Sequence, residues 1–426
     1  DEFDSLLGSA AVEYPDCLLT SGSPNYENLI KYARGEPVTN CRSRATNNSA
    51  TDENVWKIGD IIYSSPSIVE YKDYALVYVG SNDGMLHAFH MGFIKNIGET
   101  LNPAKLCDDS SASSCTHTSI GKESWAFVPK DAMPYLRYMA NPDYNHIYTV
   151  DLKPFIVNIG SQIILIGGMR LGGGTDATDA DAINPPSDTG TIGRSAYYAL
   201  DITDPLNPKY LWRYAPDGMG FSYSGPAYIK RQDADGKWHY FILFASGPTT
   251  YEGRSTQDLQ IFTVDLFTGE EKDVFGDVPS ELGINNAFGG RLFTNGLDIN
   301  EDGQTDFIFL GNTDNADGEY SSMTGGIVKI WTGSDDPKNW HYDKNYLVFN
   351  SNPITARSKV MDCFPEQLSF PFLYFGTGRY FVSNDQTQDT NGDVNYLYGV
   401  PFNYGADNKP IKGAVSINSS NNASDL

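Results

Sequence analysis

The stretch Pro66-Ser-Ile-Val-Glu-Tyr-Lys-Asp-Tyr-Ala-Leu-Val-Tyr-Val-Gly-Ser-Asn-Asp-Gly-Met-Leu-His-Ala-Phe89 decides the fold of this chain. It contains three short runs rich in β-branched and aromatic residues, at 66–71, 74–79 and 84–89. Asp73 and Ser81-Asn-Asp-Gly84 stand between the runs and are residue types typical of tight turns. The pattern predicts three short consecutive strands.

The same pattern returns four more times along the chain. Each cycle contains a strand, an apolar strand that ends in glycine, a turn, and a strand that ends in Asp or another polar residue. The later cycles lie within residues 154–214, 225–265, 290–331 and 354–400. Three or four strands in each cycle, repeated roughly every 40 to 75 residues, are typical of propeller blades with insertions. The sequence therefore predicts an all-β fold, a β-propeller of about seven blades with loop insertions.

We expect residues 56–426 to form the propeller domain and residues 1–55 to form an irregular N-terminal segment that packs on it. Within that segment, residues 26–33 show weak helical periodicity, with Leu29, Ile30 and Ala33 on one face. Arg34-Gly-Glu-Pro37 would end this helix. Two β-sandwiches are the alternative architecture, but the repeated pattern argues against them.

The composition of the 426-residue chain suits an all-β protein. Aromatic residues make up 13%, and 41 Gly and 23 Pro supply many turns. The chain has 30 basic and 54 acidic residues, a net charge of −24. This charge argues against nucleic acid or an anionic membrane surface as partners and favours cations or a basic protein surface. The sequence has no run of 18 apolar residues, so we predict no membrane-spanning segment.

The five cysteines indicate an oxidising compartment. Cys107 and Cys115 bracket a short polar loop, and Cys17 and Cys41 flank another polar insertion. We expect each of these two pairs to form a disulfide, which leaves Cys363 over; five buried or free thiols are the alternative. No C-x-x-C occurs, which argues against a zinc site or thioredoxin-like chemistry. Disulfides together with a calcium site would place the protein outside the cytosol.

A candidate calcium loop lies in the fourth cycle, at Asp298-Ile-Asn-Glu-Asp-Gly-Gln-Thr-Asp306. Oxygen-bearing side chains occupy its first, third, fifth and ninth places, and glycine occupies the sixth, where a Ca²⁺ loop places its glycine. The twelfth place is Phe309 instead of the glutamate of an EF-hand, and a strand pattern follows. We predict that the loop caps a β-hairpin; an ordinary acidic turn is the alternative. The predicted Ca²⁺ ligands are Asp298, Asn300, Asp302, the backbone carbonyl of Gln304, and Asp306.

Other acidic stretches carry weaker signals. The insertion at 172–188 contains Asp176, Asp179, Asp181 and Asp188, which could bind a second cation, although a mobile loop is the favoured interpretation. The stretch from Asp389 to Asn395 resembles a calcium loop but has its glycine too early. Residues 233–236 and 314–319 are predicted to be hairpin turns.

The motifs of common enzyme classes are missing from the sequence. The six histidines form no metal-binding pair such as H-E-x-x-H, and neither G-x-S-x-G nor a glycine-rich phosphate loop occurs. His87 and His239 fall in strand patterns and are predicted to be packing residues. We therefore predict that the chain is not an enzyme.

One enzymatic alternative stays open. The stretch 199–214 resembles the repeat of quinoprotein dehydrogenases, which are propellers that use pyrroloquinoline quinone and Ca²⁺. That family commonly stacks its cofactor on a disulfide between adjacent cysteines, and no adjacent pair occurs here. The resemblance therefore implies a modified quinoprotein-like blade architecture rather than the activity.

Several stretches in one order resemble the C-terminal propeller of the PilY/PilC family of type IV pilus proteins. They are residues 28–36, 58–66, 78–89, 199–204, 298–306, 374–380 and 396–400. The resemblance implies a secreted protein at the pilus tip (the fimbrium) or outer surface, or in the periplasm or outer membrane. Such a protein supports pilus assembly and extension, opposes retraction, and contributes to adhesion and twitching motility. Its implied partners are minor pilins or other pilus machinery and a host-cell surface receptor.

In that family a calcium loop in the propeller regulates extension and retraction. The resemblance implies that this loop corresponds to Asp298, Asn300, Asp302, Gln304 (by its backbone) and Asp306. Some members also carry an Arg-Gly-Asp integrin motif. This chain has Arg34-Gly-Glu36 instead, so integrin binding is not implied.

Overall fold

The computed structural model describes residues 14–45, 55–96, 104–110, 115–175, 192–276, 283–314, 323–349, 352–362, 371–381, 385, 395–401 and 415–418. The chain divides into two compact units, one of residues 1–176 and 184–215 and the other of residues 177–183 and 216–426. The boundary expected between the N-terminal segment (1–55) and the propeller domain (56–426) does not coincide with this division and stays a prediction.

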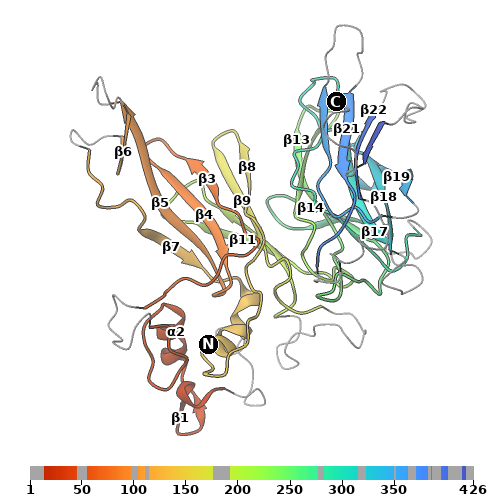
Figure 1. Ribbon diagram of the computed structural model, residues 1–426. Helices are drawn as coiled ribbons and strands as arrows, with labels where there is room; N and C mark the ends of the chain where they lie inside the picture. The colour runs from red at the N-terminus through yellow and green to blue at the C-terminus, as the bar shows by residue number, and fades with distance from the viewer. Residues whose placement is uncertain are drawn as a thin grey trace. The chain divides into compact units, whose positions relative to one another are not determined.

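In its described residues, the first unit contains two large antiparallel sheets besides a two-stranded pair near the N-terminus (Figure 1). One has the order β3-β4-β5-β6, with β7 also paired to β5. Its strands are β3 (Ser67–Glu70), β4 (Ala75–Ser81), β5 (Met85–Asn96), β6 (Ala104–Cys107) and β7 (Glu123–Phe127). The other has the order β11-β10-β9-β8 and consists of β8 (Phe155–Ile159), β9 (Gln162–Gly168), β10 (Tyr197–Asp201) and β11 (Lys209–Tyr214). The three strands predicted between residues 66 and 89 are confirmed as β3, β4 and β5.

The second unit contains three further four-stranded antiparallel sheets, each in simple chain order. The first consists of β12 (Ala227–Gln232), β13 (Trp238–Ala245), β14 (Ile261–Asp265) and β15 (Glu271–Phe275). The second consists of β16 (Ala287–Gly289), β17 (Phe307–Asp314), β18 (Thr324–Trp331) and β19 (His341–Phe349). The third consists of β20 (Lys359–Asp362), β21 (Pro371–Gly376), β22 (Tyr396–Pro401) and β23 (Val415–Asn418). The short helix η5 (Pro337–Asn339) precedes β19.

These five sheets have the form of propeller blades, because four are meanders of strands consecutive in the chain and the first differs only in that β6 and β7 both pair with β5. The prediction of an all-β, propeller-like fold is confirmed, and a total of about seven blades stays a prediction. The apolar second strands of two sheets, β9 and β13, are buried on both sides over most of their length: in β9, Ile164, Leu165 and Ile166 are fully buried. Burial on both faces explains why these strands lack alternation of apolar and polar residues.

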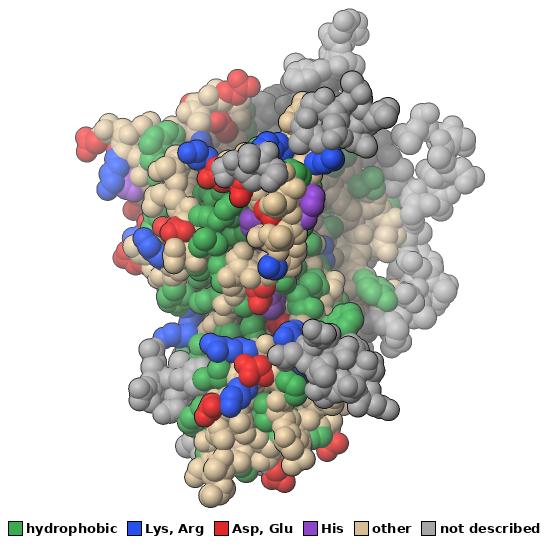
Figure 2. All heavy atoms as spheres, turned by 90° about the vertical axis from the view of Figure 1, so that its left-hand side faces the viewer, with side chains coloured by type: hydrophobic (Ala, Val, Ile, Leu, Met, Phe, Trp, Pro, Cys, Tyr) green, Lys and Arg blue, Asp and Glu red, His purple; other side chains and the backbone are tan. Residues whose placement is uncertain are grey.

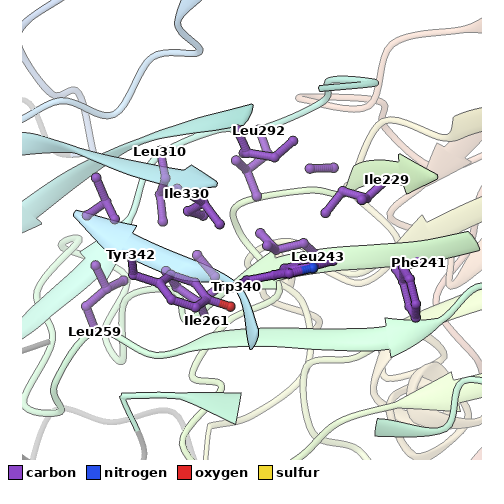
Figure 3. Close-up of a cluster of buried hydrophobic side chains, with 14 of the residues drawn as sticks. Ile229, Phe241, Leu243, Leu259, Ile261, Leu292, Leu310, Ile330, Trp340 and Tyr342 are labelled. Atoms are coloured by element: carbon purple, nitrogen blue, oxygen red, sulfur yellow. The ribbon is translucent and has the colours of Figure 1, made fainter. Parts of the chain in front are cut away.

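Side chains from neighbouring blades fill the core of the second unit. Ile229 and Leu243 come from the β12–β15 sheet, and Leu310 and Ile330 come from the β16–β19 sheet. All four are at most 1% exposed, and Figure 3 shows them within one cluster between the strands. Burial of this apolar surface is the main force that holds the two sheets together.

The residues before the first sheet and those that follow β7 together form a small cap at one end of its strands (Figure 1). Helix α2 (Tyr26–Ala33) begins where the Asn25 side chain accepts a hydrogen bond from the Asn28 N–H at 3.0 Å, which caps the helix N-terminus. Leu29 and Tyr32 face the core, while Ile30 is 39% exposed, so the expected apolar face of this helix was partly wrong. The other elements of the cap are η1 (Asp16–Leu18), β1 (Leu19–Thr20), β2 (Ser23–Pro24), η3 (Lys130–Tyr135) and α3 (Leu136–Met139).

Two disulfides close loops in the first unit. Cys17 pairs with Cys41, and Cys107 pairs with Cys115, as predicted from the sequence. Cys363 lies outside the described residues. No helix in the described part of the chain is long and apolar enough to cross a membrane.

Candidate metal centre

The loop at residues 298–306 leads directly into strand β17 and is closed at its base by backbone hydrogen bonds. The Leu297 N–H donates to the Phe307 carbonyl at 2.9 Å, and the Asp306 N–H donates to the Leu297 carbonyl at 2.6 Å. On the other side of β17, the Thr332 N–H donates to the Asp306 carbonyl at 2.9 Å. The ends of the loop are therefore fixed by the β16–β19 sheet.

Inside the loop, the four side chains predicted as ligands turn back onto the backbone of the loop. The Asp298 carboxylate accepts from the N–H groups of Asp302 (3.2 Å) and Gly303 (2.7 Å). The Asn300 Oδ1 atom accepts from the Asp302 N–H at 3.1 Å. The Asp306 Oδ2 atom accepts from the Ile299 N–H at 2.9 Å. These oxygens therefore line the inner side of one tight turn, and no helix follows it.

Asp302 completes this arrangement. Its Oδ1 atom accepts from the Gln304 N–H at 2.8 Å, and its Oδ2 atom accepts from the Asn300 and Gln304 side chains. The hydrogen bond from the Gln304 backbone is the main cause that lowers the pKa of Asp302. The carboxylate therefore stays ionised at neutral pH, as a cation ligand must.

Two residues of the loop adopt left-handed backbone conformations. Glu301 has φ of 57° and Gly303 has φ of 86°. Glycine is the residue that adopts this region without steric cost, so Gly303 is what allows the loop to turn so sharply.

The donor set consists of hard oxygen atoms and suits Ca²⁺ rather than a thiolate- or imidazole-binding metal. The three carboxylates are not drawn together around one point, however. Within the described residues, the group that brings three ligating atoms within 4.8 Å of one another is Asp233, His239 and Asp335. To bind an ion, Asp298, Asp302 and Asp306 would have to exchange contacts with backbone N–H groups for contacts with the cation.

The neighbouring blade also contacts this loop, which the sequence did not indicate. The Thr305 N–H donates to the Lys230 carbonyl of β12 at 2.9 Å, and the Gln232 N–H donates to the Gln304 Oε1 atom at 2.8 Å. The Arg231 Nη1 atom donates to the Thr305 carbonyl at 2.9 Å and lies 3.6 Å from the Asp306 Oδ1 atom. The loop is thus tied to strand β12, whose residues lie more than 70 positions earlier in the chain.

In the group of Asp233, His239 and Asp335, the first two residues lie at the hairpin between β12 and β13, and Asp335 comes from the segment between β18 and η5. The predicted turn at 233–236 is confirmed: the Asp233 Oδ1 atom accepts from the N–H groups of Asp235 (3.0 Å) and Lys237 (2.9 Å). The His239 Nε2 atom lies 2.9 Å from the Asp233 Oδ2 atom, and this hydrogen bond is the main cause that lowers the pKa of Asp233. His239 also stacks with Phe241, so it is both a packing residue, as predicted, and a hydrogen-bonding residue of the hairpin.

An apolar cleft of about 900 Å³ lies in the first unit, between α2 and the strands β5 and β7. Its walls include Leu29, Met85, Phe89 and Val128. Figure 2 shows hydrophobic side chains gathered over the middle of this side of the molecule, with basic side chains beside them. The charged and polar residues that line the cleft are Arg34, Lys57, His87 and Glu123.

His87 lies in the wall of this cleft and is only 5% exposed. Its Nε2 atom lies 3.0 Å from Asp83 Oδ2, and its Nδ1 atom lies 2.5 Å from Glu123 Oε1. Burial lowers the pKa of His87, but the hydrogen bonds to the two carboxylates outweigh it and raise the pKa to about 9. His87 is buried and stacks on Phe89, as expected of a packing residue, and it also forms an ion triad with Asp83 and Glu123 that the sequence did not indicate.

The two weaker cation predictions are not tested by this geometry. Asp176, Asp179, Asp181 and Asp188 lie outside the described residues, as do Asp389 and Asp393.

Comparison with known proteins identifies the relatives of this chain. No family model matches it. A type IV pilus biogenesis factor PilY1 homolog of Xylella fastidiosa is 28% identical over 353 residues, which cover 76% of this chain and 19% of that protein. The type IV pilus biogenesis factor PilY1 of Pseudomonas aeruginosa is 23% identical over 426 residues, which cover 88% of this chain and 30% of that protein. The curated homologues of this chain are PilY1 pilus biogenesis factors. The resemblance drawn from the sequence is therefore confirmed.

The PilY1 proteins are much longer than the region they share with this chain, which spans less than a third of their length. The crystal structure of the Pseudomonas aeruginosa PilY1 C-terminal domain matches 78% of this chain at 20% identity with a TM-score of 0.46. The PilY1 relatives are named for pilus biogenesis rather than for an enzymatic activity.

Proposed function

We propose that this chain is a calcium-binding propeller module of a type IV pilus biogenesis protein. The proposed Ca²⁺ ligands are Asp298, Asn300, Asp302, the Gln304 carbonyl and Asp306. The observation that carries the proposal is the inward orientation of all four side-chain oxygens within one loop of a chain whose homologues are PilY1 proteins. By analogy with sensor loops, the dissociation constant would lie between about 10⁻⁶ and 10⁻⁴ M.

The electrostatics of the loop support this proposal. Asp298, Asp302 and Asp306 carry like charges within nine residues, and Glu301 adds a fourth. Mutual repulsion of these carboxylates is relieved when a divalent cation binds among them. The ends of the loop are fixed to β17 and β12, so binding would reshape a local surface and leave the blades intact.

The regulatory part of the proposal is that this surface contacts the pilus machinery or a minor pilin. Calcium occupancy would favour extension over retraction and so support twitching motility and adhesion. The two disulfides support an extracellular or periplasmic location, with the pilus tip as the proposed site of action. A host-cell surface receptor is a further proposed partner of this outer surface.

Calorimetry with CaCl₂ tests the binding half of the proposal. Asp306→Ala removes one proposed ligand and is expected to weaken binding by at least about tenfold, since a lost charged ligand leaves the ion incompletely coordinated. Glu301→Gln is the matched control, because it removes one negative charge from the same loop without removing a proposed ligand. Equal affinities of Asp306→Ala and wild type would refute the site.

The regulatory half needs cells that carry the same variants in the full-length protein. We expect Asp306→Ala cells to show fewer extended pili and less twitching, and Glu301→Gln cells to resemble the wild type. If Asp306→Ala cells have normal pili although the variant has lost calcium binding in vitro, the regulatory role is refuted. Calcium in the wild-type protein would then have only a structural role.

A further inference from the structure

We propose that Arg231 on strand β12 competes with calcium for Asp306 and thereby lowers the calcium affinity of the loop. This inference rests on the proposed function, because it concerns the same candidate site. It assigns to the neighbouring blade a role in setting the calcium concentration at which the loop responds.

The geometry identifies Asp306 Oδ1 as the atom for which the two cations would compete. The Oδ2 atom of Asp306 already accepts the Ile299 N–H at 2.9 Å. The Oδ1 atom lies 3.6 Å from Arg231 Nη1. The side chains of Arg231 and Asp306 are 12% and 17% exposed, so water screens this ion pair less than it screens a surface pair.

Arg231 is held beside the loop by contacts other than the ion pair. Its Nη1 atom donates to the Thr305 carbonyl at 2.9 Å. On either side of it along β12, the Lys230 N–H donates to Thr305 Oγ1 and the Gln232 N–H donates to Gln304 Oε1. The Nε atom of Arg231 is buried and has no hydrogen-bond partner within the described part of the chain. The guanidinium therefore has no alternative acceptor at Nε that would draw it away from the loop.

A bound calcium ion would then sit close to a fixed positive charge. When Asp306 turns toward the ion, Arg231 loses its counter-ion and stays within a few ångströms of a divalent cation. A like charge at about 4–6 Å from the ion is expected to weaken calcium binding by roughly tenfold or more. Removing the guanidinium should therefore tighten calcium binding, whereas removing an ordinary supporting residue would weaken it.

Lys230 provides a matched control on the same strand. Its Nζ atom lies over the Trp238 ring, 5.5 Å from the ring centroid, and near Gly303, but it is not paired with any proposed ligand. Lys230→Met and Arg231→Met remove the same formal charge and leave an apolar side chain of similar length. A general effect of charge would appear in both variants, and displacement of a specific counter-ion would appear in Arg231→Met alone.

Calorimetric titration with CaCl₂ tests the inference on wild type, Arg231→Met and Lys230→Met, with far-UV circular dichroism as the check of folding. Arg231→Met is expected to bind calcium about tenfold more tightly than wild type, and Lys230→Met to stay within about twofold. Arg231→Gln serves as a second variant where Arg231→Met does not fold.

The possible outcomes separate this inference from the proposed function. If Arg231→Met binds calcium and the wild type does not, the result would also support competition between Arg231 and calcium for Asp306. Unchanged or weaker binding by the arginine variants, with normal binding by wild type, would overturn the inference alone. An equal gain in Lys230→Met would overturn it as well. No binding by any of the variants or the wild type would overturn both proposals.

Discussion

The Nδ1 atom of His87 lies 2.5 Å from the Oε1 atom of Glu123, and the opposite ring nitrogen contacts Asp83. Because both nitrogens face carboxylates, the protonated imidazole is the form that this buried site stabilises. The raised pKa of His87, about 9, follows from these two contacts. This ion triad gives the first unit a stability that depends on pH.

The direction of that dependence follows from the folded and unfolded pKa values. The pKa of His87 rises from 6.5 to about 9 on folding, so its contribution is fully present below pH 6.5 and is lost as the pH rises through 9. The contribution is on the order of 3 kcal/mol. We expect urea unfolding to show that wild type loses stability relative to His87→Gln between pH 7 and pH 10.

A control for the pH experiment is His90→Gln, because the His90 Nε2 atom contacts the backbone carbonyl of Asp108 at 2.7 Å rather than a carboxylate. This variant controls for the loss of an imidazole ring whose partner is a carbonyl group. A difference in stability between His87→Gln and wild type that stays constant from pH 7 to pH 10 would contradict the assignment of a charged His87.

The two disulfides differ in the length of chain that they close, which predicts a difference in stability. Cys17–Cys41 spans 24 residues and Cys107–Cys115 spans 8. A disulfide that closes a longer loop lowers the entropy of the unfolded chain further. Removal should therefore lower the free energy of unfolding by about 3–4 kcal/mol for Cys17–Cys41 and by about 2–3 kcal/mol for Cys107–Cys115. Urea unfolding of the two double Cys→Ser variants measures this. A larger loss for the Cys107–Cys115 variant would contradict the loop-length explanation.

Many of the strands could be predicted from the sequence because apolar runs and the turn residues between them mark strands locally. The contacts of His87 and Arg231 could not be predicted in the same way. His87 finds Glu123 across 36 positions, and Arg231 finds Thr305 across 74 positions, through strand pairing and blade packing. A histidine or arginine in a strand pattern gives no sign of such a partner. The oxygens of the candidate calcium loop, by contrast, lie within nine consecutive residues, so the sequence alone places them in one loop.

The absence of quinoprotein chemistry is a separate prediction. Cys17, Cys41, Cys107, Cys115 and Cys363 include no two adjacent residues, so the disulfide on which quinoproteins commonly stack their cofactor cannot form. We expect the protein incubated with pyrroloquinoline quinone and CaCl₂ to lose the quinone absorbance band on gel filtration. It should also show no dye-linked alcohol dehydrogenase activity. A retained band together with activity would establish the oxidoreductase alternative.

The last prediction concerns a lysine placed at position 306, where its ammonium group could mimic a bound cation. The position of Arg231, 3.6 Å from Asp306, argues that the introduced lysine would instead face a fixed guanidinium. Both Asp306→Lys and Asp306→Ala remove the acceptor of the Ile299 N–H, so their difference isolates the repulsion between like charges. We expect Asp306→Lys to be less stable than Asp306→Ala by about 1 kcal/mol in urea unfolding.

The control repeats this comparison in proteins that also carry Arg231→Met. There the free energies of unfolding of the two position-306 variants should differ by only a few tenths of a kcal/mol, roughly the error of additivity. A difference that persists without the arginine would show that the lysine clashes with the loop itself. If the difference disappears, the double variant Asp306→Lys/Arg231→Met is the one to use as an ion mimic. Its pili would then be counted in cells grown in calcium-free medium.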